Sequence, residues 1–316
     1  MNESVDLYDV TIIGGGTTGL FAAFYCGMRG MTTKVIESKP TLGGKVTQFF
    51  PEKQIYDIGG IPTITGDALI EQMKEQATQH SPAMVTSQWI DEVKKNLDGT
   101  FTLLSTTGEK HLSKTIIVAT GMGAFHVVGP ERIDTTRIVN VNDSISHPKQ
   151  FSDKCVVIHS NNRVGVDWAL TLEDIADTVY LVNNKSTFQH ASEEEMSKLH
   201  QSNVKVRLNS KIKQFYESND AIESITMSDE KDREEQVKVD HILIYDGVKL
   251  TQTPFKKWGL TTDKGRIAVD LNMKTGVDGL FAAGDATIYD GKTMLIASGY
   301  TEAITAVNSA KKYINP

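Results

Sequence analysis

Three glycines near the start of the chain have a spacing that lets backbone approach a phosphate. Gly14, Gly16 and Gly19 follow the strand-like VTII at residues 10–13 and precede a largely apolar stretch at residues 20–30. In a G-x-G-x-x-G turn, the first glycine permits the tight turn, the second leaves room for a pyrophosphate, and the third allows close helix–strand packing. The following helix directs N–H groups and a positive dipole end at the phosphates. The spacing predicts a dinucleotide site, with a glycine turn in an ordinary α/β domain as the alternative.

An acid and a long loop follow this corner. Glu37 ends the strand-like KVIE roughly 20 residues after the glycines, where a carboxylate can hold a ribose hydroxyl. Residues 38–62 are rich in Gly and Pro and longer than a simple connection, and such loops are usually functional. Their aromatic side chains favour a loop laid along a cofactor with one ring stacked on it. A packed surface loop is the alternative.

The pattern of strands and helices places these residues in an α/β protein with two domains, as expected for 316 residues. A strand meander with a hairpin turn at Asp98-Gly99 ends in KTIIVATG, and a second βαβ unit begins at CVVIHS. GLFAAGD and the helical stretch at 295–314 then repeat the theme of the first domain. We expect two Rossmann-like three-layer ββα/βαβ domains, the first discontinuous (1–122 and 247–316) and the second (123–246) inserted into it.

Composition narrows the function classes. The net charge of −7 offers no basic stripe for a nucleic-acid partner, and no apolar run reaches the ~20 residues of a membrane span. The first strand is reached by residue 8, so no signal peptide is expected. Two distant cysteines, Cys26 and Cys155, fit a reducing, cytoplasmic setting, and the histidines show no metal-ligand spacing. Metal sites and catalytic side chains are not predicted.

Four separated motifs carry a family resemblance. TIIGGGTTGLFAA, KTIIVATG, GLFAAGD and LIASGYTEA occur in the order typical of flavoproteins with two dinucleotide-binding domains. Within that superfamily the chain most closely resembles the thioredoxin-reductase-like ferredoxin–NADP(+) reductases of bacteria, through FFPEKQIYDIGGIP, VDWAL, KKWGL and DGKTMLIASGYTEAITAVNSAKKYI. Thioredoxin reductases proper are disfavoured, because their CxxC pair in the second domain is missing here.

The resemblance implies FAD held by the first domain. The glycines would cradle the pyrophosphate, Glu37 the adenosine ribose, and Asp285 the ribityl chain. Lys45 stands where the family usually has Gln, and Phe50 where a Tyr usually stacks on the isoalloxazine. Ile90 would meet adenine through backbone groups, Phe125 would pack near the flavin, and the last helix would open near Ser298 at the flavin N1–C2=O edge. The implied FAD set is Gly14, Gly16, Thr17, Thr18, Gly19, Glu37, Gly44, Lys45, Phe50, Ile90, Phe125, Asp285, Ser298 and Gly299.

The second domain departs from the family at the positions that bind NADP(H). The three motif glycines fall at Ser160, Asn162 and Gly165, and the family's basic pair falls at Asn184 and Lys185. Asn162, Arg163 and Lys185 are the candidate NADP contacts. The printed sequence ends at Pro316, whereas the family usually adds a C-terminal tail over one flavin face, and we expect that face to lack this cover.

Two functions follow from the resemblance and its departures. In the first, the chain is a ferredoxin or flavodoxin–NADP(+) reductase, in which NAD(P)H gives a hydride to flavin N5 and single electrons leave for the protein carrier. In the second, it binds FAD without NADPH and acts as an electron-transfer or redox-sensing flavoprotein. A homodimer is expected from the family alone.

Overall fold

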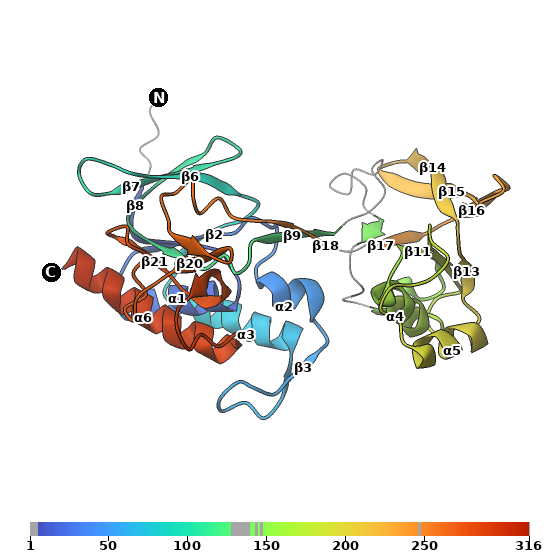
Figure 1. Ribbon diagram of the computed structural model, residues 1–316, viewed down its shortest axis with the longest axis horizontal. Coiled ribbons are helices and arrows are strands. Elements are labelled where there is room, and N and C mark those ends of the chain that lie inside the picture. Colours follow the sequence, from blue (N-terminus) through green and yellow to red (C-terminus); the bar gives the residue numbers. More distant parts are fainter. Residues whose placement is uncertain (1–5, 128–139, 143–144, 146–147, 246–247, 316) are drawn as a thin grey trace. The chain divides into compact units, whose positions relative to one another are not determined.

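The computed structural model describes residues 6–127, 140–142, 145, 148–245 and 248–315, and the side chains at 124–127 and 248–250 lie outside that description. The chain divides into two compact units (Figure 1). The first, which we call the flanking unit, comprises Met1–Ala124 and Leu250–Pro316; the second, the inserted unit, comprises Phe125–Lys249. The strands β9 (Ala124–Val127) and β18 (Val248–Thr251) pair with each other where the chain crosses between the units.

The flanking unit is built on a sheet in the order β5-β2-β1-β8-β7-β6, with β21 also paired to β8. Its elements in chain order are β1 (Leu7–Ile13), α1 (Thr17–Met28), β2 (Thr33–Ile36), α2 (Gly44–Phe49), β3 (Gln54–Ile55), β4 (Ile64–Thr65), α3 (Gly66–Thr78), β5 (Ala83–Val85), β6 (Ile90–Lys95), β7 (Phe101–Ser105), β8 (Lys110–Val118), β19 (Thr262–Asp263), β20 (Arg266–Ala268), β21 (Leu280–Ala282), the 3-10 turn η2 (Gly284–Ala286), β22 (Thr287–Ile288) and α6 (Ile296–Ile314).

Side chains along the central strands point alternately to the two faces of this sheet, and other elements cover both faces. Val10 and Ile12 of β1 pack with α1, α3 and α6, which form one layer (Figure 1). Ile13 and its neighbours on the opposite face pack with Phe255 and Trp258 from the segment that returns after the insertion. The helix α3 buries Leu69, Ile70, Met73 and Ala77. Burial of both faces explains why the parallel strands read as continuous apolar runs.

The register of the parallel strands brings their carboxyl ends together. Ile13 pairs with Ile36 and with Val118, and Val118 pairs in turn with Ala282. The residues that follow these strands (Gly14, Glu37, Ala119 and Ala283) therefore emerge at one edge of the sheet. In open α/β sheets this edge is where ligands bind.

The inserted unit repeats the three-layer plan. Its parallel sheet has the order β10-β17-β11-β12-β13, with helices on one face and the meander β14-β15-β16 on the other. Its elements are β10 (Val141–Asn142), η1 (Pro148–Phe151), β11 (Cys155–Ser160), α4 (Arg163–Leu172), β12 (Thr178–Val182), α5 (Glu193–Gln201), β13 (Lys205–Arg207), β14 (Lys211–Ser218), β15 (Ala221–Ser228), β16 (Glu234–Lys238) and β17 (His241–Tyr245). The two Rossmann-like three-layer units expected from the sequence are therefore present.

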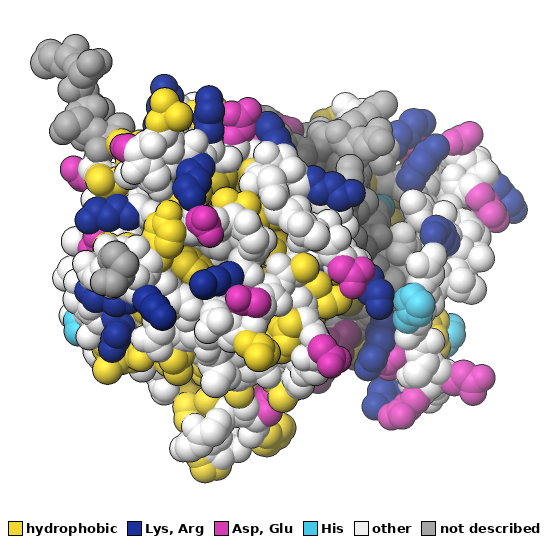
Figure 2. Space-filling model, turned by 60° about the vertical axis from the view of Figure 1, so that its left-hand side comes forward, with side chains coloured by type: hydrophobic (Ala, Val, Ile, Leu, Met, Phe, Trp, Pro, Cys, Tyr) yellow, Lys and Arg dark blue, Asp and Glu magenta, His cyan; other side chains and the backbone are white. Residues whose placement is uncertain are grey.

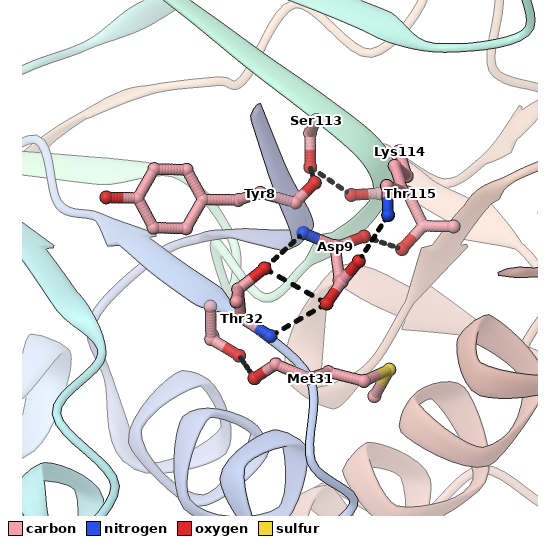
Figure 3. A network of polar contacts seen from close by, with 8 residues as sticks. Tyr8, Asp9, Met31, Thr32, Ser113, Lys114 and Thr115 are labelled. Atoms are coloured by element: carbon pink, nitrogen blue, oxygen red, sulfur yellow. Dashed lines mark hydrogen bonds and ion pairs between the residues drawn. The ribbon is translucent and has the colours of Figure 1, made fainter. Parts of the chain in front are cut away.

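A polar network ties the amino end of β1 to its neighbours (Figure 3). The Asp9 carboxylate accepts hydrogen bonds from the Thr32 backbone and hydroxyl and from Lys114 Nζ, the last at 2.8 Å. Burial opposes ionisation of Asp9, but the hydrogen bonds from Lys114 and Thr32 outweigh it and lower its pKa. This network lies at the opposite end of β1 from the glycines.

The surface carries charges of both signs. On the face drawn in Figure 2, basic and acidic side chains lie among one another rather than in separate fields. Within the described residues, no helix combines the length and the apolar character needed to cross a membrane.

Candidate functional site

The turn between β1 and α1 has glycine where a side chain would collide with backbone. Gly14 has a φ of +111°, and a Cβ there would lie 2.5 Å from the carbonyl oxygen of Ala119. A Cβ at Gly19 would lie 1.9 Å from the carbonyl oxygen of Gly14, so α1 contacts the end of β1 at closest approach. Gly16 differs from both, because a Cβ there would meet only the Cα of Gly44, at 3.8 Å. The space beside Gly16 is therefore open.

The N-terminus of α1 faces this open space without a cap of its own. Gly16 is the N-cap residue and provides no side-chain cap, and no acidic residue lies in the first turn. The first N–H groups of a helix need partners, and the positive dipole end favours an anion. Thr17 and Thr18 open the helix. The arrangement suits a phosphate group.

Glu37 lies beside the glycines, and its predicted role at the ribose stays a prediction. It is buried, with one carboxylate oxygen accepting from the backbone N–H of Gly15 at 2.7 Å. The other oxygen accepts from the Ser38 hydroxyl and the Lys39 backbone N–H. These donors fix the carboxylate at the carboxyl end of β2, next to the glycine turn.

The loop after Glu37 returns to the same turn. The Gly43 N–H donates to the Gly15 carbonyl at 2.8 Å, and a Cβ at Gly44 would lie 3.1 Å from the Cα of Gly16. The next residue, Lys45, forms an ion pair with Asp285, with 2.9 Å between Nζ and Oδ2. Part of the loop expected to lie along a cofactor is therefore the short helix α2, and its first turn adjoins the glycines.

The C-terminal third of the chain completes a cluster of residues around the glycine turn. We call it the cluster below, and it comprises Gly14, Gly16, Thr18, Gly19, Glu37, Gly44, Lys45, Gly284, Asp285 and Gly299. The Thr18 hydroxyl lies where side chains at Gly284 and Gly299 would stand, 2.6 and 2.4 Å from Cβ atoms built there. The start of α1, the Gly284-Asp285 corner and the start of α6 are thereby in contact. The last helix begins at Ile296, two residues before the expected opening near Ser298, and its N-cap Leu295 provides no side-chain cap.

Three expected cofactor residues are placed less specifically. Phe50 is the C-cap residue that follows α2, with 43% of its surface exposed, and Lys53 Nζ lies 5.0 Å from its ring centroid. Ile90 begins β6 with its side chain in the apolar core. Phe125 lies in β9, but its side chain falls outside the described residues. Their roles stay predictions.

A buried ion pair beside the cluster was missed from the sequence. Lys292 and Glu302 contact each other with 8% and 4% of their side chains exposed. The Tyr289 hydroxyl donates a hydrogen bond to Glu302. Burial and this hydrogen bond raise the pKa of Tyr289 to about 12. One signal could have revealed the pair: Glu302 falls on the helical stripe that includes Gly299, Ala303 and Ala306, all of which are buried.

The corresponding corner of the inserted unit is filled by its own residues. Asn162 caps α4: its Oδ1 accepts from the Val164 N–H at 3.0 Å, and its Nδ2 donates to the Tyr245 carbonyl at 3.2 Å. The Arg163 N–H donates to the carbonyl of Gln189. Ser160 is fully buried, and a Cβ at Gly165 would lie 2.2 Å from that of Ser160. The helix end that would meet a diphosphate is already capped.

The other candidate NADP contacts do not converge on that corner. The Arg163 guanidinium pairs with Glu195, with 2.7 Å between Nε and Oε1. Lys185 lies exposed in the loop after β12, where its backbone N–H donates to the Asn183 side chain. These residues fit a dinucleotide diphosphate less well than the start of α1 does.

Known proteins are similar to this chain over nearly its whole length. A family model described as pyridine nucleotide-disulphide oxidoreductase matches residues 8–310. Ferredoxin–NADP reductase 1 of Bacillus velezensis is 45% identical, over 100% of this chain and 95% of its own length. Ferredoxin–NADP reductase 1 of Listeria monocytogenes is 41% identical, over 98% and 94%.

Solved structures share the fold at low identity. The thioredoxin reductase of T. acidophilum has a TM-score of 0.62 at 20% identity, covering 98% of this chain and 99% of its own. The bacillithiol disulfide reductase of Bacillus cereus has a TM-score of 0.62 at 18% identity, covering 97% and 100%. These structures show the shared fold, and the family model and the ferredoxin–NADP reductases confirm the resemblance drawn from the motifs. The chain belongs to the pyridine nucleotide-disulphide oxidoreductase family, among the thioredoxin-reductase-like ferredoxin–NADP(+) reductases.

Proposed function

We propose that the chain is an FAD-dependent ferredoxin–NADP(+) reductase, moving electrons between NAD(P)H and a one-electron carrier such as ferredoxin or flavodoxin. The observation that carries the proposal is the uncapped start of α1 beside the open space at Gly16. Support also comes from full-length relatives that bear this enzyme name. FAD would accept a hydride and release its electrons one at a time.

The residues of the flanking unit fit FAD. Gly14, Gly16 and Gly19 would hold the pyrophosphate with the first N–H groups of α1, and Glu37 would bind the adenosine ribose. Buried polar atoms normally have a partner, yet the Thr120 hydroxyl is buried beside this turn without one among the described residues. A bound cofactor would supply such a partner.

The second half of the cluster would face the flavin. Asp285, held by Lys45, would bind the ribityl chain. The start of α6 would direct its positive dipole end at the flavin, where negative charge is favoured. This role asks for no nucleophile or general base from the chain.

Disulfide reduction, which the family name includes, is not part of the proposal. Cys26 is buried in the core of the flanking unit, and burial raises its pKa to about 12. Cys155 lies at the start of β11, and burial raises its pKa as well. Reactive thiols need the opposite shift.

A second function is favoured by the capped start of α4. If Asn162 keeps NADPH away, the chain is an FAD-binding electron-transfer or redox-sensing flavoprotein with another electron donor. The test is to add NADPH, then NADH, to the purified yellow protein without oxygen and to follow flavin absorbance. Rapid bleaching supports the reductase; bleaching by dithionite but not by millimolar nucleotide supports the second function. Colourless protein that takes up no added FAD contradicts both.

The cellular compartment and the oligomeric state are a separate matter from the chemistry. We propose a cytoplasmic homodimer, supported by the family resemblance and by two free cysteines outside any disulfide. Light scattering coupled to size-exclusion chromatography tests the dimer, and a mass near the 34.8 kDa of one chain would contradict it.

A further inference from the structure

The buried pair Lys292–Glu302 holds both backbone groups of one glycine. Glu302 Oε2 accepts from the N–H of Gly284 at 2.7 Å, and Lys292 Nζ donates to the carbonyl of Gly284 at 3.0 Å. The Tyr289 hydroxyl donates to Glu302 Oε1, and the Thr287 hydroxyl donates to the Gly284 carbonyl. The peptide groups on both sides of Gly284 are therefore fixed by charged side chains.

Gly284 stands where orientation matters. Its φ of +75° is open mainly to glycine, and the Thr18 hydroxyl lies where its side chain would be. The next residue is Asp285, whose carboxylate pairs with Lys45 at the glycine turn. A rotation of the 284–285 peptide would carry that carboxylate away from the start of α1.

Burying two charges is costly for a protein, and apolar replacements of such pairs are often neutral or stabilising. Lys292 and Glu302 are buried, whereas most ion pairs of the described chain lie at partly exposed positions. Both side chains also form hydrogen bonds with the backbone of Gly284. A role in orienting the cofactor segment explains a pair that stability alone does not require.

We propose that Lys292 and Glu302 are positioning residues for FAD, which set the Gly284–Asp285 corner so that Asp285 faces the ribityl chain. This inference rests on the proposed FAD role of the flanking unit. It assigns the pair to cofactor binding and leaves the redox chemistry to the flavin. The rival explanation is a purely structural link between α6 and the loop before it.

Two variants separate positioning from structure. Lys292→Met leaves the Glu302 carboxylate buried without its cation, and should lower stability strongly. Lys292→Met/Glu302→Gln buries no charge and keeps an acceptor for the Gly284 N–H. It removes the charged donor to the Gly284 carbonyl and leaves only the neutral Thr287 hydroxyl there. Its stability should return toward that of the parent protein, whereas its FAD affinity should not.

The matched control is Asp9→Asn/Lys114→Met, which neutralises the pair of Figure 3 at the other end of β1. For each full-length protein, urea unfolding of the apoprotein gives stability, flavin fluorescence gives the FAD dissociation constant, and visible circular dichroism reports flavin orientation. Loss of one charged hydrogen bond corresponds to about a tenfold rise in the dissociation constant.

The inference expects about tenfold weaker FAD binding and an altered dichroism in the neutral 292/302 variant, with both unchanged in the control. Parental FAD binding in the neutral variant, or equal weakening in the control, would overturn it and leave the proposed function standing. Parent protein that binds no FAD would contradict the proposed function itself. Should the neutral variant not fold, Lys292→Arg decides: retained stability with altered dichroism supports positioning, and an unaltered dichroism opposes it.

Discussion

At the scale of single residues, Gly16 offers the sharpest test of the pyrophosphate site. Its φ is −77° and the space beside it is open, so Gly16→Val should still fold, at a cost of about 1 kcal/mol because valine is a poorer N-cap residue than glycine. The valine would occupy the volume that a diphosphate needs, and the protein should purify without flavin. The ratio of flavin to protein absorbance measures this.

Gly59→Val is the control, because a Cβ at Gly59 would meet no atom within 4 Å and Gly59 does not have a positive φ. It should keep its flavin. Full FAD occupancy in Gly16→Val would show that the pyrophosphate lies elsewhere.

Two tyrosines beside the cluster predict a loss of stability in alkali. Burial raises the pKa of Tyr289 and of Tyr300 to about 12, with Glu302 and Asp57 respectively adding to the effect. Unfolded tyrosine titrates near pH 10. The unfolded chain therefore releases protons that the folded chain keeps, and the free energy of unfolding falls as the pH rises from about 10 to about 12.

Urea midpoints measured across that range test the fall. Cys26 acts in the same direction, since burial raises its pKa to about 12. The double variant Tyr289→Phe/Tyr300→Phe should therefore show a shallower decline rather than none. A decline as steep as that of the parent would assign the effect to other groups.

At the scale of elements, the N-termini of α1 and α4 differ, because α1 has no side-chain cap whereas Asn162 caps α4. Removing the cap of α4 is therefore predicted to favour nucleotide binding. Asn162→Gly frees the Val164 N–H and also removes the donor to the Tyr245 carbonyl, so it should cost about 1 kcal/mol although glycine is a tolerable N-cap. If the cap is the obstruction, NADPH should bind a few-fold to about tenfold more tightly, the range typical of an anion at a helix N-terminus.

Ser160→Gly can be added to Asn162→Gly to widen the corner further. Asn162→Asp is the control, because it keeps a cap and adds a negative charge, and it should weaken binding. Titration with NADPH followed by flavin or tryptophan fluorescence measures the affinities. Unchanged affinity in both glycine variants would remove the cap as an explanation.

Local patterns predicted much of the site, and long-range contacts did not follow from them. The glycine spacing, Glu37 and the strand ends could be predicted, because each depends on a short segment and a standard βαβ connection. The ion pairs Lys45–Asp285 and Lys292–Glu302 could not, because they join segments that only the folded sheet brings together. The cap at Asn162 is local, and Asn as a favoured N-cap residue could have indicated it, whereas the contact of Asn162 with Tyr245 joins two strand ends that only the folded sheet brings together.

At the scale of the whole molecule, the crossing between the units predicts a separable cofactor domain. Because β9 pairs with β18, the ends left by removing 125–249 lie close together, since paired strands are about 4.8 Å apart. A chain with that segment replaced by a short Gly-Ser linker should fold, bind FAD and be reduced by dithionite.

The same chain should not be reduced by NADPH, even if the parent protein is. Absorbance spectra under anaerobic conditions measure both properties, with the parent as control. Loss of FAD binding on removal of the inserted unit would show that the flanking unit does not hold the cofactor alone.

The split of the flanking unit also sets an order of events during synthesis. The inserted unit is continuous in sequence, whereas β21 and α6, which complete the central sheet and its helical layer, come last. As a polypeptide emerges from the ribosome, the middle segment is thus available to fold before its neighbour is whole. A nascent chain would carry the glycine turn early yet gain its flavin only near termination, so premature stops would yield colourless products.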